Sequence, residues 1–90
     1  MRQYWKLVFT PDADRDLKAL SAPIIIRILN KLVWLKNNFD LLKPVPLHGS
    51  FSGSYKLKVG DWRIVYRTDF SEKVIIVVMI DHRSKVYSIR

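Results

Sequence analysis

The sequence contains no cysteine, which excludes disulfide bonds and cysteine-ligated metal ions. A chain without cysteine fits the reducing environment of the cytoplasm. The longest apolar run, at 74–80, is too short to cross a membrane. No signal-peptide core follows the first residues. We therefore expect a cytoplasmic protein that has no membrane partner.

Acidic residues are scarce, with 8 Asp and Glu against 16 Lys and Arg, so the net charge is +8. The excess is spread evenly, because residues 1–45 and residues 46–90 each carry 8 basic and 4 acidic residues. A basic folded surface suits a nucleic acid or an acidic protein partner, although solubility explains the net charge equally well. The two histidines and the scattered aspartates show no metal-ligand spacing, so we predict no metal site and no cofactor.

The 90 residues predict a single domain over 1–90, with enough apolar sequence for one core. Residues 4–9 predict a first strand, because Trp5, Leu7 and Phe9 fall on one side of it. Thr10 can cap a helix and Pro11 fits its first turn, which predicts a helix to about residue 20. A second helix is predicted over 22–37, and its apolar surface is wider than one stripe. Core packing is the favoured explanation for that surface, with a groove for a partner as the alternative.

Residues 37–46 are predicted to be a connector, because prolines at 44 and 46 exclude a helix. The following stretch, 54–66, predicts a β-hairpin in which aromatic and aliphatic residues alternate with cations around a Gly-Asp turn. Lys56, Lys58 and Arg63 then share one face. Three neighbouring cations repel one another, so an anionic ligand would relieve this arrangement.

The last predicted strand, 74–80, is almost entirely β-branched, which is typical of a central strand covered on both faces. The element order is therefore β-α-α-β-β-β. This order predicts an α+β fold with a mainly antiparallel sheet and both N-terminal helices packed on one face. The opposite face would carry Lys56, Lys58, Arg63 and Arg83.

Three segments in order resemble the RelE/ParE toxin superfamily. They are Leu47-His48-Gly49, then Tyr-Lys-Leu-Lys-Val-Gly-Asp-Trp-Arg-Ile-Val-Tyr at 55–66, then His82-Arg83 with Val86-Tyr87. Members usually read Tyr-x-Leu-Arg-Val-Gly-Asp-Tyr-Arg-Val-x-Tyr followed by His-Arg-x-x-x-Tyr. The Phe-Thr-Pro-x-Ala start of the first helix matches as well, so the resemblance covers essentially the whole chain.

The resemblance implies the RelE-like fold and a toxin of a type II toxin–antitoxin pair. RelE-like members are ribosome-dependent endoribonucleases that cleave mRNA in the A site. The implied partners are a cognate antitoxin with an acidic, amphipathic segment and mRNA on the ribosome, with contacts to 16S rRNA. The catalytic positions of the family fall on Lys56, Lys58, Arg63, Arg83 and Tyr87. Only three residues follow Tyr87, whereas some active members carry a further helix.

These residue types can cleave RNA without a metal ion if the 2′-OH attacks the adjacent phosphate. Arg63 suits the charge that gathers on the phosphoryl oxygens. Lys58 is the candidate base, because neighbouring cations favour a neutral lysine amine, and Lys56 contributes electrostatically. Arg83, with His82 as the alternative, would assist the leaving 5′-oxygen.

Tyr87 would stack on a base or orient the 2′-OH. Each of these residues also has a structural interpretation. The lysines can be solvated, Arg63 and Arg83 can form ion pairs with nearby aspartates, and Tyr87 can anchor the C-terminus. Both histidines, His48 and His82, are better explained structurally. Two other functions stay open: ParE-like inhibition of DNA gyrase without catalysis, and an inactive RNA-binding relative.

Overall fold

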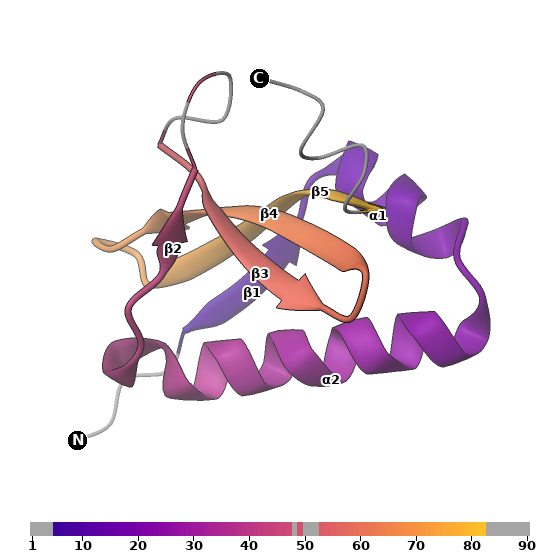
Figure 1. Cartoon of the computed structure of the whole chain (residues 1–90). Coiled ribbons are helices and arrows are strands. Elements are labelled where there is room, and N and C mark those ends of the chain that lie inside the picture. Colours follow the sequence, from indigo (N-terminus) through magenta and orange to yellow (C-terminus); the bar gives the residue numbers. More distant parts are fainter. Residues whose placement is uncertain (1–4, 48, 50–52, 83–90) are drawn as a thin grey trace.

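The computed structural model describes residues 5–47, 49 and 53–82. These residues form one five-stranded sheet in the order β1-β5-β4-β3-β2, with two α-helices packed against it (Figure 1). The predicted α+β fold is confirmed. The elements are β1 (Lys6–Phe9), α1 (Pro11–Lys18), α2 (Ala22–Asn38), the 3₁₀ helix η1 (Phe39–Leu41), β2 (Val45–Pro46), β3 (Tyr55–Val59), β4 (Trp62–Asp69) and β5 (Val74–His82).

Both helices begin where the sequence predicts. Thr10 caps α1, and its Oγ1 accepts a hydrogen bond from the backbone N–H of Ala13 at 3.2 Å. This contact satisfies one of the N–H groups that the first turn of a helix leaves without a partner. The far ends differ slightly from the prediction, because α1 ends at Lys18 and α2 continues to Asn38.

The sheet has one strand more than predicted. Strand β2 lies inside the expected connector and pairs with β3 through only two residues, Val45 with Lys56 and Pro46 with Tyr55. A strand this short shows no period-two pattern, and proline cannot donate to a ladder, which is why the sequence did not predict it. Strand β1 pairs with β5 in parallel, and the other neighbouring strands are antiparallel.

Strand β5 is an inner strand, as predicted, but β4 holds the middle position. Burial alternates along β5, because Ile75 and Val77 are buried while Ile76 and Val78 are half-buried. The prediction of full cover on both faces was therefore wrong. The helix side of β5 is covered more closely than the other side.

The core lies between the helices and one face of the sheet. Its buried members come from both α-helices, from the three central strands, from η1 and from the residue before β1: Trp5, Ala13, Leu17, Ile28, Leu32, Leu35, Phe39, Val59, Ile64, Tyr66, Ile75, Val77 and Ile80. Helix α2 runs along this face for its whole length (Figure 1). Ile26, Val33 and Trp34 of α2 stay exposed, so the core uses only part of the wide apolar surface of α2. No helix in the described part of the chain is long and apolar enough to span a bilayer.

Candidate functional site

The cations of the hairpin share one face of the sheet. Lys58 lies opposite Arg63, Leu57 opposite Ile64, and Lys56 opposite Val65. Directly opposed residues project to the same face, with Cβ atoms about 4.5–5.5 Å apart. Leu57 and Ile64 pack against the core, so Lys56, Lys58 and Arg63 must project from the other face. The predicted grouping of these three side chains is confirmed.

The turn between β3 and β4 needs a glycine. Gly60 has a φ of +58°, in the left-handed region, and a Cβ at this position would lie 3.0 Å from Nη2 of Arg27. Helix α2 therefore contacts the tip of the hairpin through Arg27. The sequence predicted the turn, but no motif marks Arg27, because its approach depends on how α2 packs against the sheet.

The three cations differ in exposure. Lys58 is exposed and Lys56 is half-buried, whereas only 4% of Arg63 is exposed. Nη1 of Arg63 donates hydrogen bonds to the backbone oxygen of Gly60 at 2.9 Å and of Trp62 at 3.1 Å. The structural alternative for Arg63, an ion pair at the surface with a nearby aspartate, is corrected in one respect, because the side chain is buried. The short turn brings two carbonyl oxygens within reach of the guanidinium.

An acidic residue lies beside Arg63. Asp81 on β5 is directly opposite Arg63 on β4, so Lys58, Arg63 and Asp81 form a row across three strands. In the next row, Val65 lies between Lys56 and Met79 and is fully buried. This face is thus partly apolar and partly acidic. An arginine–aspartate ion pair is therefore a sound structural alternative for Arg63.

Three residues singled out in the sequence, Arg83, Tyr87 and His48, lie outside the described residues. His82 is described, and its ring contacts the Trp62 ring edge-on, with 5.6 Å between the centroids. This contact agrees with a structural role for His82. Within the described ranges, no three His, Asp or Glu side chains gather as metal ligands.

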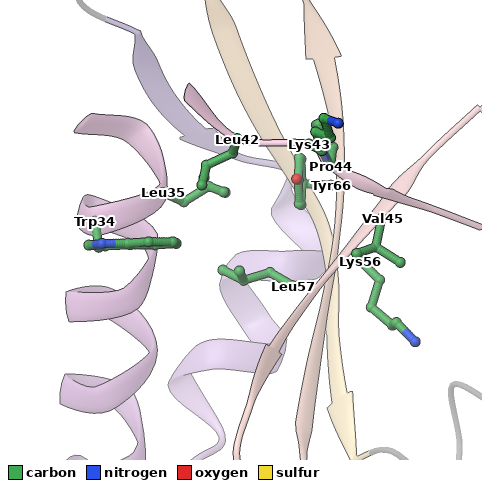
Figure 2. A pocket seen from close by; sticks show the side chains of 9 residues that line it. All are labelled: Trp34, Leu35, Leu42, Lys43, Pro44, Val45, Lys56, Leu57 and Tyr66. Atoms are coloured by element: carbon green, nitrogen blue, oxygen red, sulfur yellow. The ribbon is translucent and has the colours of Figure 1, made fainter. Parts of the chain in front are cut away.

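A cavity of about 150 Å³ lies on the helix side of the same hairpin (Figure 2). We call it the α2–β3 pocket, and its lining residues are Trp34, Leu35, Leu42, Lys43, Pro44, Val45, Lys56, Leu57 and Tyr66. Burial, followed by the neighbouring Tyr55, raises the pKa of Tyr66 from 10.0 to about 12. The Tyr66 hydroxyl therefore stays neutral at physiological pH.

Comparison with known families decides what kind of protein carries this hairpin. The family model described as "ParE toxin of type II toxin-antitoxin system, parDE" matches residues 7–87. The chain belongs to this toxin family. The RelE/ParE resemblance of the sequence is thereby confirmed, and with it the assignment to the toxins of type II toxin–antitoxin systems.

Two similar proteins carry RelE-type names. Toxin RelG of Mycobacterium tuberculosis is 27% identical over 79 residues, which cover 88% of this chain and 91% of RelG. The isolated RelE toxin of E. coli is 26% identical with a TM-score of 0.72, covering 96% of this chain and 93% of RelE.

Two further structures share the fold at lower identity. The toxin–antitoxin complex RelBE2 of M. tuberculosis matches with a TM-score of 0.79 at 24% identity, over 90% of this chain and 100% of that one. The chromosomal ParDE system of P. aeruginosa matches with a TM-score of 0.68 at 19% identity. The match covers 88% of this chain and 96% of that one. The RelE-like fold expected from the sequence is therefore confirmed.

Proposed function

We propose that this toxin is a ribosome-dependent endoribonuclease that cleaves mRNA in the A site, in the cytoplasm. The observation that carries the proposal is the placement of Lys58 directly opposite Arg63, with Lys56 on the same face. Two cations held about 5 Å apart at Cβ can flank one phosphate group of an RNA strand. The similarity to RelG and to E. coli RelE supports the same function.

In this mechanism the 2′-oxygen forms a bond to phosphorus, and the bond between phosphorus and the 5′-oxygen breaks. Lys58, which must be a neutral amine to do so, takes the proton of the 2′-OH as general base. Arg63 offsets the charge on the phosphoryl oxygens, and Lys56 adds to the positive potential. Arg83 supplies charge relief or a proton to the leaving 5′-oxygen, and Tyr87 positions the nucleotide. The upstream product ends in a 2′,3′-cyclic phosphate.

The burial of Arg63 adds a condition to this mechanism. Two backbone carbonyls fix the guanidinium in advance of the reaction, which favours electrostatic stabilisation of a transition state. A side chain that is only 4% exposed must be uncovered before it touches RNA. We expect docking on the ribosome to uncover it, which makes the activity ribosome-dependent.

The substitution Lys58→Ala separates chemistry from binding. Loss of a general base lowers the rate by about 10²–10⁴-fold. The affinity for ribosomes should change less than about threefold, since one charge among many matters little to a diffuse contact with a polyanion. Single-turnover cleavage and ribosome pelleting measure the two quantities. Lys6→Ala is the control, because Lys6 is an exposed lysine on β1, at the other edge of the sheet.

Equal losses of cleavage and of ribosome affinity in Lys58→Ala would reduce Lys58 to a docking residue. If Lys6→Ala behaves like Lys58→Ala, the effect reports net charge alone. Either result would remove the general base from the proposal.

Non-catalytic inhibition of DNA gyrase is the second candidate function. The family model that matches this chain is named for the ParE toxin, which supports this candidate. In addition, Asp81 lies opposite the buried Arg63, an arrangement that suits a structural rather than a catalytic arginine. Induced expression distinguishes the two functions. Primer extension on mRNA should show cuts within codons for the nuclease, whereas a DNA-damage response without such cuts would indicate gyrase as the target.

A cognate antitoxin is the proposed protein partner. Complexes of RelBE2 from M. tuberculosis and of RelE and RelB from Pyrococcus horikoshii join toxins of this fold to antitoxins. The net charge of +8 favours a partner with an acidic, amphipathic segment that folds on binding. We expect the neighbouring gene to encode it. Co-purification and relief of growth arrest test this, and a neighbour that does neither would contradict the pairing.

A further inference from the structure

Helix α1 takes the place of a strand beside the end of β5. Strand β1 pairs with β5 only as far as Phe9, which lies opposite Val77. Within the described residues, no strand pairs with 78–82 on that edge. The chain instead turns into α1, which packs against β5 (Figure 1). The backbone groups on this edge of β5 therefore need partners from α1 or from solvent.

The N-cap and the second turn of α1 supply three of these partners. The backbone N–H of Thr10 donates to the carbonyl oxygen of Val77 at 3.0 Å, and its hydroxyl donates to that of Val78 at 3.5 Å. Oδ2 of Asp16 accepts a hydrogen bond from the backbone N–H of Ile80 at 3.1 Å. Because Ile80 is only 3% exposed, loss of this acceptor would leave a buried N–H without its partner, which is costly.

The three contacts surround an extra residue in β5. Tyr66 lies opposite Val77, but Val65 lies opposite Met79, so Val78 has no opposite residue on β4. Such a β-bulge bends the strand and shifts every following residue by one position relative to its neighbour strand. Since successive side chains point to opposite faces, a shift of one residue decides the face that each later side chain occupies.

The bulge places Asp81 on the cationic face. With the bulge, Ile80 lies opposite Ile64 in the core, and Asp81 lies opposite Arg63. If the register that precedes the bulge continued, Ile80 would lie opposite Arg63 instead. An apolar side chain would then leave the core, and Arg63 would lose its acidic neighbour. The position of the bulge therefore matters for the composition of both faces.

Asp16 differs from the other acidic residues of α1. Asp12 forms an ion pair with Arg15, and Asp14 forms one with Lys18 at 2.8 Å, both within the helix. Exposed pairs of this kind contribute little to stability. The partner of Asp16 is 64 residues away in the sequence, and a hydrogen bond to an ionised carboxylate is stronger than one to a neutral oxygen. Asp14 is thus a matched control for Asp16.

We propose that Asp16 is a positioning residue for the cationic face. Its carboxylate holds the backbone of Ile80, which keeps the bulge at Val78 and Asp81 beside Arg63. Asp81 and the carbonyl oxygens of the hairpin turn together limit where the guanidinium can lie. The consequence for cleavage rests on the proposed function, because a cation stabilises a transition state only when it is held at the place where charge develops.

The first test measures the register in solution with three variants of the full chain. Asp16→Leu keeps the approximate shape of the side chain and removes the acceptor, Asp16→Asn keeps a neutral acceptor, and Asp14→Leu makes the same change away from β5. In Asp16→Leu, amide hydrogen exchange at Ile80 should accelerate about tenfold or more relative to Ile28, a fully buried residue of α2 that reports opening of the whole core.

NMR cross-peaks between the backbones of Arg63 and Asp81 should weaken in Asp16→Leu. In Asp16→Asn they should remain, and exchange at Ile80 should rise only about two- to fivefold, because a neutral acceptor makes a weaker bond. Asp14→Leu should match the unmodified protein in both measurements. If Asp16→Leu does not fold, Asp16→Asn still decides, since exchange at Ile80 identical to that of the unmodified protein would overturn the proposal.

The second test separates positioning from stability. At a temperature where all variants are folded, the single-turnover rate at saturating ribosomes should fall about tenfold or more in Asp16→Leu. The ribosome concentration that gives half the maximal rate should stay within about twofold, because the cations that contact the polyanion remain. Asp16→Asn should keep the rate within about threefold of the unmodified protein, and Asp14→Leu should leave it unchanged.

Three results would contradict parts of this inference, and each points to a different part. Equal acceleration of exchange at Ile80 and Ile28 would overturn the positioning role, because Asp16 would then stabilise the domain as a whole. Full cleavage by Asp16→Leu, with faster exchange at Ile80, would overturn the link to Arg63. An unmodified toxin that cuts no mRNA would contradict the proposed nuclease, while the exchange and cross-peak measurements would still decide whether Asp16 holds the register.

Discussion

The two faces of the β3–β4 hairpin are built from the same thirteen-residue stretch and serve different ends. On the helix side, Leu57, Ile64 and Tyr66 pack into the core. On the other side, Lys58 and Arg63 lie opposite each other, although like charges in this position destabilise a sheet. One face explains why the hairpin folds. On the other face Asp81 lies beside Arg63, so Lys58 is the cation to which we attribute the proposed function rather than folding.

Arg63 and Lys58 show that the second face is not uniform. Lys58 is exposed, whereas Arg63 is buried and bonded to the backbone of the turn. An exposed lysine can exchange a proton with a substrate, and a fixed arginine can hold a charge in place. The difference is the basis on which we propose different roles for the two residues, with Lys58 as general base and Arg63 as electrostatic stabiliser.

Truncation of a core side chain should give the largest change in stability. Ile64→Ala removes a fully buried side chain and should lower the free energy of unfolding by about 2–5 kcal/mol. Ile26→Ala, at an isoleucine on α2 that is 58% exposed, should change it by less than about 1 kcal/mol. Urea denaturation measures both. Equal losses would mean that the helix side of the hairpin is not the stabilising face.

Alkaline pH should destabilise the protein through Tyr66. An unfolded tyrosine ionises near pH 10, whereas burial holds the folded group neutral until about pH 12. Between these values the unfolded state binds fewer protons, so stability falls as pH rises. The loss should approach about 2 kcal/mol at pH 12, and it should be absent in Tyr66→Phe. An identical pH dependence of unfolding in the two proteins would show that Tyr66 is not responsible.

The smallest change should come from the cationic face. The double variant Lys56→Ala, Lys58→Ala removes two like charges from one strand and should alter the free energy of unfolding by no more than about 0.5 kcal/mol. Thermal unfolding at low and high salt tests this. A loss comparable to that of Ile64→Ala would show that these lysines are structural, and the division between the two faces would fail.

The faces of the hairpin were predictable from sequence, because side-chain direction in a strand depends only on the alternation of residues around a tight turn. The burial of Arg63 was not predictable, because alternation indicates the face of the sheet from which a side chain projects but not which other residues cover it. Strand β2 was too short to show a period, and the contact of Arg27 with Gly60 depends on how α2 packs. The motif identified the candidate site, but the position of Asp81 beside Arg63 follows only from the pairing register of β5 with β4.

In the mechanism that we propose, the substrate supplies the nucleophile to a cationic hairpin. The most direct test is to add this toxin to programmed ribosomes whose mRNA carries one 2′-deoxynucleotide at the A-site position that is otherwise cut, and to measure cleavage at that position. We predict that cutting stops at that nucleotide, while toxin binding to the ribosome is unchanged because the contacts to phosphate remain. Cutting at the deoxynucleotide at the normal rate would contradict the 2′-OH mechanism and the roles of Lys58 and Arg63 in it.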